Sequence, residues 1–409
     1  MDIPQIRIAD YTYDLPQERI ATYPLSERDA SNLLVYKDGV IGQKRFYELP
    51  ELLPECSVMV FNDTKVVPAR LLFTKSTGAL IEIFCLEPVS PPEYARNFDS
   101  VGSCSWRCIV GNAKKWKEGS LDIYVPEGQT LGFKLQAFME EREANSFIVK
   151  FVWDGGLSFS EVLESCGRVP IPPYLGRDTE QIDLERYQTL YARFRGSVAA
   201  PTAGLHFTQR VLDRLDERGI GRHTVCLHVG AGTFLPVKSE YIEGHTMHSE
   251  PFVVTRELLC AIAGKPEGAP VVSVGTTSTR TLESLYFLGV RCLEAGPRNW
   301  EPSPVEQWEP YGREYKYTLR QSFDALIQYL DYKCLSELKC RTRIIIVPGY
   351  SFKVVDIQIT NFHQPQSTLL LLIGAIVGED WRRIYDYAMD KGFRFLSYGD
   401  SSLLWKKKD

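Results

Sequence analysis

Short apolar runs separated by polar turns occupy the chain between Leu71 and Trp153. The runs read ALIEIFCL, WRCIV, SLDIYV and SFIVKFVW, and glycine, proline or charged residues lie between them. Runs of this length and spacing are typical of β-strands joined by tight turns. We therefore predict that residues 71–153 form a small all-β module, folded as a barrel. The proline-rich stretch 167–177 that follows indicates a stiff connection.

The rest of the chain alternates between the patterns of strands and helices. Apolar runs with strand character end in polar turns, and longer segments carry their apolar residues on one face, as amphipathic helices do. This alternation indicates an α/β fold. Two predicted helices begin at a capping residue, one at Thr208 and one at Ser367 or Thr368, and the others follow residue 274, include 323–330 and span 381–389. The predicted strands are 57–61, 225–229, 271–274, 344–347 and 355–359.

Composition narrows the class of protein. The chain has 409 residues, of which 44% are hydrophobic and 24% are charged, as expected for a soluble globular protein of two or three domains. The formal net charge of −5 argues against general nucleic-acid binding. Any such role therefore needs a local basic patch.

Targeting and cysteine patterns predict a cytoplasmic protein. The opening residues lack the basic and apolar regions of a signal peptide. The most apolar helical candidate, 369–377, is too short to cross a bilayer, so no membrane partner is expected. The ten cysteines include no CxxC pair, which favours reduced thiols over a zinc ribbon or a redox site.

Two segments at the ends of predicted strands have the composition of ligand-binding loops. HVGAGTF places glycines where backbone N–H groups can approach a ligand closely, although a tight turn has the same composition. GTTSTRT opens a helix with a glycine and a row of hydroxyl residues, which suits a carboxylate or a phosphate, although helix capping is the alternative. The substrate-binding candidates are Gly230, Gly232, Thr233, Phe234, Thr276, Thr277, Ser278 and Arg280.

Five of the six histidines lie beside glycine, proline or hydroxyl residues. Histidine exchanges protons near neutral pH, and positions at presumed strand ends predict a shared cleft. Asp63, in the turn NDT, is a further acid or base candidate, with an Asx-turn as the alternative. An HxxH pair outside a helix is a poor metal site, so no metal is expected. The five histidines are His206, His228, His245, His248 and His363, and Glu250 lies near two of them.

A basic and aromatic stretch lies within the predicted β module. Cations beside aromatic rings suit a looped RNA, because phosphates need positive charge and splayed bases need stacking partners. For each basic segment, the alternative to RNA binding is an ordinary solvent-exposed turn. The RNA-binding candidates are Arg70, Arg107, Lys114, Lys115, Lys117, Arg177 and Lys353, with Trp106 and Trp116 as neighbouring aromatic residues.

An ordered set of strings carries a family resemblance. FNDTKVVPARL, GRVPIPPYLGR, AAPTAGLHF, HVGAGTFLPV, GHTMHSE, GTTSTRTLES, VPGYSFKVVDIQITNF and FLSYGD follow one another between Tyr13 and Leu404. Together they resemble the S-adenosylmethionine:tRNA ribosyltransferase-isomerase family of queuosine biosynthesis. No single string is decisive, but the ordered set is highly specific.

The resemblance implies a fold and a reaction. The expected fold is a discontinuous α/β catalytic domain, residues 1–70 and 154–409, built around a mixed, barrel-like sheet and interrupted by the barrel at 71–153. The ribosyl part of S-adenosylmethionine would move to 7-aminomethyl-7-deazaguanine at the wobble position of certain tRNAs, giving epoxyqueuosine, adenine and methionine. S-adenosylmethionine is then a co-substrate and no tightly bound cofactor is expected. The macromolecular partner would be the anticodon arm of the tRNA.

The residues leave the roles within this reaction open. A sulfonium acidifies the adjacent ribose C–H, so a positioned base is needed, and His206, His228 or His363 would serve. A second histidine would protonate the departing adenine, and Asp63 or Glu250 would accept a proton from the substrate amine. The helix start at Thr276 to Ser278, with the charge of Arg280, is expected to bind the methionine carboxylate, and Phe207 and Phe234 are expected to lie against the sulfonium. His248 is a further substrate-binding candidate.

Two departures from the family pattern accompany the resemblance. Gln364 and Gln366 stand where the family has leucine and lysine, and the stretch 288–340 is longer than expected and reads as an insertion. The alternatives are a non-catalytic or substrate-shifted tRNA-binding paralogue, an S-adenosylmethionine-dependent methyltransferase and a metal-dependent hydrolase. Protein partners and oligomeric state stay open.

Overall fold

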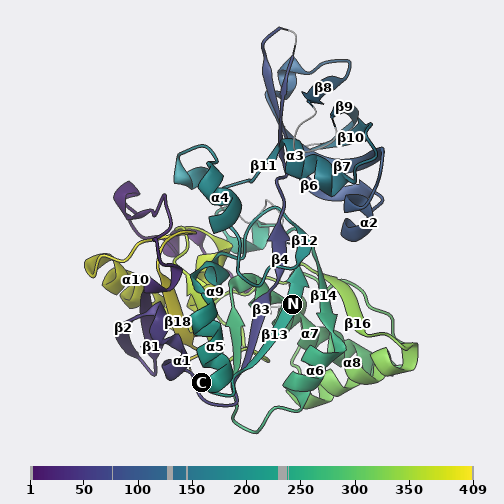
Figure 1. Ribbon diagram of the computed structural model, residues 1–409. Helices are drawn as coiled ribbons and strands as arrows, with labels where there is room; N and C mark the ends of the chain where they lie inside the picture. Colours follow the sequence, from purple (N-terminus) through teal and green to yellow (C-terminus); the bar gives the residue numbers. More distant parts are fainter. Residues whose placement is uncertain are drawn as a thin grey trace.

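The computed structural model describes residues 3–75, 77–126, 132–143, 146–228, 237 and 239–407. They form a mixed α/β structure with one nine-stranded, one seven-stranded and one two-stranded sheet. Figure 1 shows the seven-stranded sheet standing clear of a larger body that is built around the nine-stranded sheet. The α/β class predicted from the alternating pattern is therefore confirmed.

The nine-stranded sheet is mixed. Four neighbouring strands at its centre, β13, β3, β15 and β17, run parallel. Antiparallel or parallel neighbours extend it on both sides. In spatial order the strands are β16 (Glu337–Thr342), β14 (Glu250–Thr255), β13 (Gly221–Leu227), β3 (Val58–Asn62), β15 (Val271–Val274), β17 (Ile357–Asn361), β18 (Ser401–Trp405), β1 (Asn32–Lys37) and β2 (Val40–Arg45).

Helices cover both faces of this sheet, which explains why every residue of β3, β15 and β17 is buried. Val58 and Val60 of β3 share a core with α7, α8 and α9 on one face. Met59 and Phe61 point to the opposite face, toward α1 and α5, as the two-residue period of a strand requires. The helices are α1 (Leu49–Leu52), α5 (Gln209–Glu217), α6 (Arg256–Ala263), α7 (Thr276–Ala295), α8 (Leu319–Lys333), α9 (Thr368–Val377) and α10 (Trp381–Asp390).

The seven-stranded sheet is antiparallel and has its own core. Phe73, Trp106 and Phe151 are buried in it, and α2 (Tyr94–Phe98), α3 (Phe159–Cys166) and the two-residue strand β11 (Gly167–Arg168) complete it. Within the described residues its pairing runs from β11 to β8 and does not close into a ring. The remaining strands are β5 (Arg70–Thr74), β6 (Leu80–Ser90), β7 (Ser103–Gly111), β8 (Leu121–Val125), β9 (Phe133–Arg142) and β10 (Phe147–Trp153).

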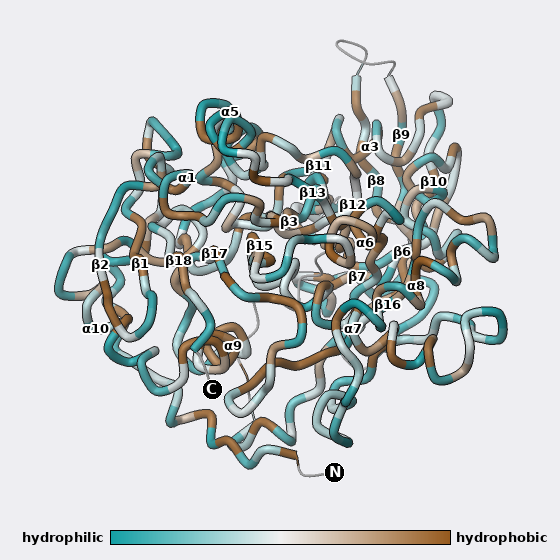
Figure 2. The backbone as a smooth tube through the Cα atoms, turned by 90° about the horizontal axis from the view of Figure 1, so that it is seen from below, coloured by the Kyte–Doolittle hydropathy of each residue, from teal (hydrophilic) through white to brown (hydrophobic). Residues whose placement is uncertain are grey.

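Most of the elements with a clear apolar period lie where the pattern predicts them. The strand 271–274 is β15, and the apolar helix α9 begins after Ser367, whose hydroxyl accepts from the Leu370 N–H. In Figure 2, α9 is brown along almost its whole length, as its sequence TLLLLIGAIV requires. The helices at 319–333 and 381–390 contain the predicted amphipathic segments. Within the described part of the chain, no helix has both the length and the apolar character needed to span a bilayer.

Two local predictions are wrong. Residues 344–347 are buried but do not pair as a strand, because their backbone groups bond to the segment before α8. The Ile345 N–H donates to the Gln307 carbonyl, and the Val347 N–H donates to the Tyr311 hydroxyl. Thr208 does precede α5, but its hydroxyl donates to Asp29 instead of capping the helix.

Candidate active site

The candidate residues gather at one edge of the nine-stranded sheet because its central strands are parallel. The four strands β13, β3, β15 and β17 end in the same direction. His228, Asp63, the start of α7 at Thr276, and His363 follow these strands in turn. Ligands of open α/β sheets bind beyond the carboxyl ends of such strands, so this edge is the candidate active site.

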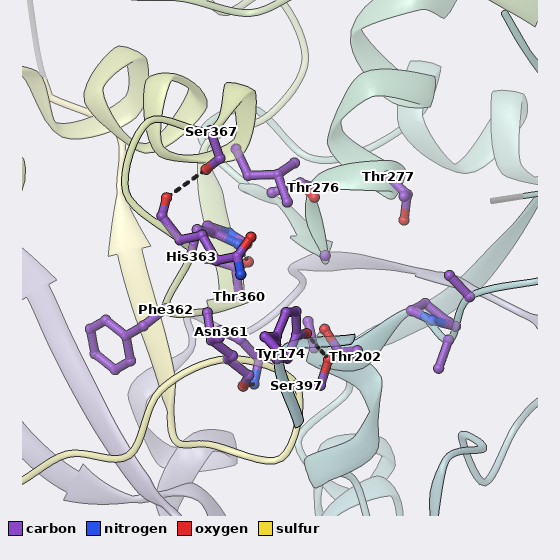
Figure 3. Close-up of a pocket in the computed structure, with 18 residues that line it drawn as sticks. Tyr174, Thr202, Thr276, Thr277, Thr360, Asn361, Phe362, His363, Ser367 and Ser397 are labelled. Carbon is purple, nitrogen blue, oxygen red and sulfur yellow. Dashed lines mark hydrogen bonds between the residues drawn. The ribbon is translucent and has the colours of Figure 1, made fainter. Parts of the chain in front are cut away.

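A first cavity lies where β15 leads into α7, and we call it the α7 cavity. Its volume is about 90 Å³. Gly275 holds the positive φ of +88° at the turn, and among the described residues no side chain caps the first turn of α7. Figure 3 shows Thr276 and Thr277 facing His363 across this space. The cavity therefore offers helix N–H groups and hydroxyls to an anionic group.

Two histidines of this region are held neutral. His363 lines the α7 cavity, its Nε2 lies 3.0 Å from Thr360 Oγ1, and burial lowers its pKa to about 3. His206 lies behind the cavity with both nitrogens engaged, Nδ1 at 2.8 Å from Ser31 Oγ and Nε2 at 3.1 Å from Asn361 Nδ2. Burial lowers the pKa of His206 to about 3 as well. His206 is a structural hydrogen-bonding residue in this arrangement.

A second cavity lies between the nine-stranded sheet and the seven-stranded one, and we call it the junction cavity. It has a volume of about 390 Å³. Asp63 is 1% exposed, and its Oδ1 has no hydrogen-bond partner in the described residues. Burial raises the pKa of Asp63 to about 6, against the opposing effects of the Thr224 hydroxyl and the Arg193 charge. The junction cavity thus contains a carboxyl group, that of Asp63, with one oxygen that has no hydrogen-bond partner in the described residues and a pKa near neutrality.

His228 forms part of the wall of the junction cavity. Its ring stacks on Tyr94 of α2 at 4.2 Å between centroids and 10° between planes. Gly196 lies against both rings, where an added Cβ would be 2.3 Å from His228 Nδ1 and 3.2 Å from Tyr94 Cδ1, so only glycine leaves room for the stacked pair. Burial lowers the pKa of His228 to about 4. The seven-stranded sheet region supports this wall through Tyr94 and lines the cavity directly through Ala95 and Phe98 of α2.

A third cavity, with a volume of about 220 Å³, is lined by His248 and Arg280, and we call it the His248 cavity. The buried Glu250 contacts both of these side chains. Glu250, 1% exposed, accepts from Arg280 Nη1 through one oxygen and lies 3.0 Å from His248 Nε2 through the other. Burial raises the pKa of Glu250, but Arg280 and His248 outweigh that effect and hold it at about 2. Arg280 Nε donates to the Ile344 carbonyl at 3.1 Å, and its Nη2 has no partner among the described residues.

The prediction of one shared cleft is corrected by this arrangement. Most of the described candidates line three separate cavities, and Leu369 lines both the α7 cavity and the His248 cavity. His206 and Glu250 line none of the three. Ser278 belongs to none of the three, because its hydroxyl turns back to donate to the Val274 carbonyl. Gln364, one of the departures from the family pattern, lines the α7 cavity. The candidates Gly230, Gly232, Thr233 and Phe234 lie outside the described residues.

Three of the predicted RNA-binding arginines are engaged within the protein. Arg70 forms a bidentate pair with Glu82, and Arg177 forms one with buried Asp183. Arg107 bonds to two glutamates, Glu87 and Glu143. Lys114, Lys115 and Lys117 are exposed, whereas Lys353 is half-buried with Nζ 5.9 Å from the Tyr286 ring. Only the three exposed lysines keep the free surface charge that a phosphate contact needs.

Glu283 is a buried residue of α7 that sequence reasoning missed. Its carboxylate accepts from the Tyr350 hydroxyl and from three backbone N–H groups of residues 353–355. Burial raises the pKa of Glu283, and these four donors oppose that effect. The carboxylate thereby fixes the segment that leads into β17 and His363. The string GTTSTRTLES contains Glu283, but only the tertiary structure brings it to that segment.

No group of three histidine, cysteine or acidic residues in the described ranges is arranged to hold a metal ion.

Comparisons with known proteins agree in naming one activity. A family model described as queuosine biosynthesis protein matches residues 8–404. An S-adenosylmethionine:tRNA ribosyltransferase-isomerase of Anaeromyxobacter sp. (strain Fw109-5) is 40% identical over 405 residues, which cover 98% of this chain and 99% of that protein. One of the same name from Trichlorobacter lovleyi is 36% identical over 401 residues, 97% of this chain and 99% of that protein.

One solved structure is also similar. It is an S-adenosylmethionine tRNA ribosyltransferase from Thermotoga maritima, which is 26% identical with a TM-score of 0.45 and covers 96% of this chain and 99% of that one.

Proposed function

This chain belongs to the queuosine biosynthesis protein family, and from that premise we propose how its site carries out the reaction. The chain is a transferase that moves and isomerises the ribosyl part of S-adenosylmethionine onto 7-aminomethyl-7-deazaguanine in tRNA, with adenine and methionine as the other products. The observation that carries this function is the match over residues 8–404, together with relatives of that name that align over almost their whole length. The family resemblance identified from the ordered strings is thereby confirmed.

The methionine part of the co-substrate is assigned to the α7 cavity. A carboxylate is favoured at the start of a helix, where N–H groups lack partners and the helix dipole is positive. Thr276 and Thr277 add hydroxyl donors at this point. Arg280 lies one turn further along α7, on the same face as Thr276, and adds positive charge. These features support S-adenosylmethionine binding here as a co-substrate.

The modified base of the tRNA is assigned to the junction cavity. The attacking amine must lose its proton, and Asp63 supplies a carboxyl whose raised pKa makes it a better proton acceptor than an ordinary aspartate. Its unpartnered Oδ1 suits an ammonium or amine group. Phe194, 54% exposed at this cavity, offers a ring face to a base taken out of its stack. The volume of about 390 Å³ accommodates a single base.

The two sheets correspond to two domains in this proposal. Residues 1–70 and 154–409 form the catalytic domain, and residues 71–153 form an inserted all-β module, an open barrel that α3 and the short strand β11 complete. The insertion at 288–340 supplies α8 and the edge strand β16 of the larger domain. Support comes from the separate cores of the two sheets and from Ala95 and Phe98, through which the β module reaches the junction cavity.

The tRNA contact is assigned to the β module. Its exposed lysines Lys114, Lys115 and Lys117 suit the phosphates of the anticodon arm. We place the enzyme in the cytoplasm, a location that its ten free cysteines support.

The function is tested by product analysis. Purified protein is incubated with S-adenosylmethionine and tRNA that carries the aminomethyl base, and the small products are separated by chromatography. Adenine and methionine are expected in equal amounts, and none with tRNA that carries guanine at the wobble position. S-adenosylhomocysteine would instead identify a methyltransferase, and tight tRNA binding without adenine would identify a non-catalytic paralogue.

A further inference from the structure

His248, Glu250 and Arg280 form a connected row in which one carboxylate joins an imidazole to a guanidinium. His248 Nε2 lies 3.0 Å from Glu250 Oε1, and Arg280 Nη1 donates to Glu250 Oε2. An ionised carboxylate only accepts hydrogen bonds, so the neutral ring carries its hydrogen on Nε2. Nδ1 of His248 is then left with its lone pair. An imidazole that a buried carboxylate holds in one tautomer is the arrangement of a general base.

The other histidines of the site are less suited to this task. His206 uses both ring nitrogens in hydrogen bonds, and one face of His228 is covered by the stacked Tyr94 ring while Gly196 lies close to its Nδ1 edge. His363 is 9% exposed and lies against Thr360. The His248 side chain, by contrast, is 35% exposed and lines a cavity of about 220 Å³. It combines access for a substrate with a fixed orientation.

Arg280 points to a ligand in the same cavity. Its residue is 6% exposed, yet Nη2 has no partner in the described ranges, and burying an unsatisfied charged donor is costly. A substrate acceptor group at Nη2 would remove that cost. Leu369 lines both this cavity and the α7 cavity, so a molecule bound by its carboxylate at the start of α7 can extend toward His248.

We propose that His248 is the base that removes the proton from the ribose carbon next to the sulfonium, and that Glu250 positions it. This inference rests on the proposed function. The C–H bond breaks, its electron pair stays on the carbon beside the positive sulfur, and the proton forms a bond to His248 Nδ1. The resulting imidazolium keeps its Nε2–H bond to the Glu250 carboxylate, which stabilises the new charge. Arg280 keeps Glu250 ionised throughout.

The test removes the His248 imidazole by mutation and then supplies free imidazole in solution. H248A is expected to release adenine at least about 100-fold more slowly in a single turnover, the usual range for a lost general base. Free imidazole added to H248A should restore adenine release in proportion to its concentration, because the half-exposed site leaves room for it. Affinity for tRNA and the unfolding temperature should stay close to those of the wild type.

A matched control is H223A. His223 is a half-buried histidine on β13 that lines none of the three cavities, and its replacement should change adenine release by about twofold or less.

Two results would overturn the inference and leave the function intact. One is H248A that releases adenine at the wild-type rate. The other is a slow H248A that imidazole does not rescue although tRNA and S-adenosylmethionine bind normally, because a base is replaceable in this way and a purely structural side chain is not. Wild-type protein that releases no adenine would instead refute the proposed function, and the assignment of His248 with it.

Discussion

The junction cavity and the His248 cavity each bury one carboxyl group at the same edge of the nine-stranded sheet. Asp63 and Glu250 are both 1% exposed, but their surroundings act on them in opposite directions. In the junction cavity burial dominates and raises the pKa of Asp63 to about 6. In the His248 cavity burial acts in the same sense, but Arg280 and His248 reverse it and hold the pKa of Glu250 at about 2.

The difference shows that the charged and hydrogen-bonding partners of a buried carboxyl group, more than its degree of burial, decide whether it stays ionised or exchanges a proton near neutral pH. Glu250 stays ionised at every physiological pH, so it suits the task of orienting His248 and balancing Arg280. Asp63 has a free oxygen and titrates within reach of neutral pH, so it suits proton exchange with a substrate amine. Two acidic residues at one sheet edge thus suit different roles, because the groups around them set their pKa values differently.

The largest effect is expected from breaking the pair in the His248 cavity. R280M retains the aliphatic bulk but leaves Glu250 buried without its compensating charge. The free energy of unfolding should fall by about 3–5 kcal/mol, as is usual when one partner of a buried pair is removed. Urea denaturation at pH 7 measures it.

The control for this change is R256M. Arg256 pairs with Asp331 on the surface, where both side chains are about half exposed, so its loss should cost no more than about 1 kcal/mol. If the free energy of unfolding fell by the same small amount in R280M and R256M, the buried pair would contribute no more to stability than the surface pair.

A smaller effect of opposite sign is expected in the junction cavity. Because the pKa of Asp63 is about 6 in the folded protein and about 3.9 when unfolded, the folded state binds the proton more tightly. Wild-type stability relative to D63N therefore falls as pH rises from about 4 to 6 and is level above that range. D63N should match the wild type near pH 4 and exceed it by roughly 1–3 kcal/mol at pH 7.

E250Q sharpens the same comparison. The pKa of Glu250 is depressed, so its stabilising effect is present above its unfolded value of about 4.3 and is lost as pH falls toward 2. E250Q should therefore be less stable than the wild type at pH 7 and approach it in acid. A D63N variant that followed this same course would contradict the contrast between the two cavities.

The smallest effect is expected far from both cavities, on the β module. The triple variant K114A/K115A/K117A should bind tRNA roughly fivefold more weakly, close to 1 kcal/mol. The slope of log affinity against log salt concentration should become shallower by about two. The reason is that binding through fewer phosphate contacts releases fewer counterions from the tRNA. Filter binding across a salt series measures both quantities.

A triple variant of lysines exposed elsewhere, K37A/K44A/K316A, carries the same charge change and serves as the control. If it weakened tRNA binding equally, the effect would be one of net charge, and the assigned contact would be wrong.

Local patterns sufficed to predict elements whose own residues decide their structure. VVSV is buried on both faces and forms β15, and Ser367 caps α9 as its sequence predicts. Residues 344–347 show where this fails. They are as apolar as a buried strand, but residues 307 and 311 satisfy their backbone, and that contact depends on a segment more than thirty residues away.

The sequence predicts that the site residues lie at strand ends, but it does not predict which of them share a cavity. His228, Asp63, Thr276 and His363 were all singled out at strand ends, and they do follow parallel strands. Their division between the junction cavity and the α7 cavity depends on strand order, which no local pattern contains. The same holds for Arg70 and Arg107, each of which bonds to a glutamate on the neighbouring strand β6, so only the register of the sheet places these pairs together.

The central claim, that this chain transfers a ribosyl group to tRNA, is tested most directly with S-adenosylmethionine carrying 13C in every ribose carbon and a deuterated methyl group. The tRNA is digested after the reaction, and the wobble nucleoside is analysed by mass. We predict that the nucleoside gains all the ribose label and no deuterium. A nucleoside that gains the methyl deuterium without ribose carbon, or neither label, would contradict the account.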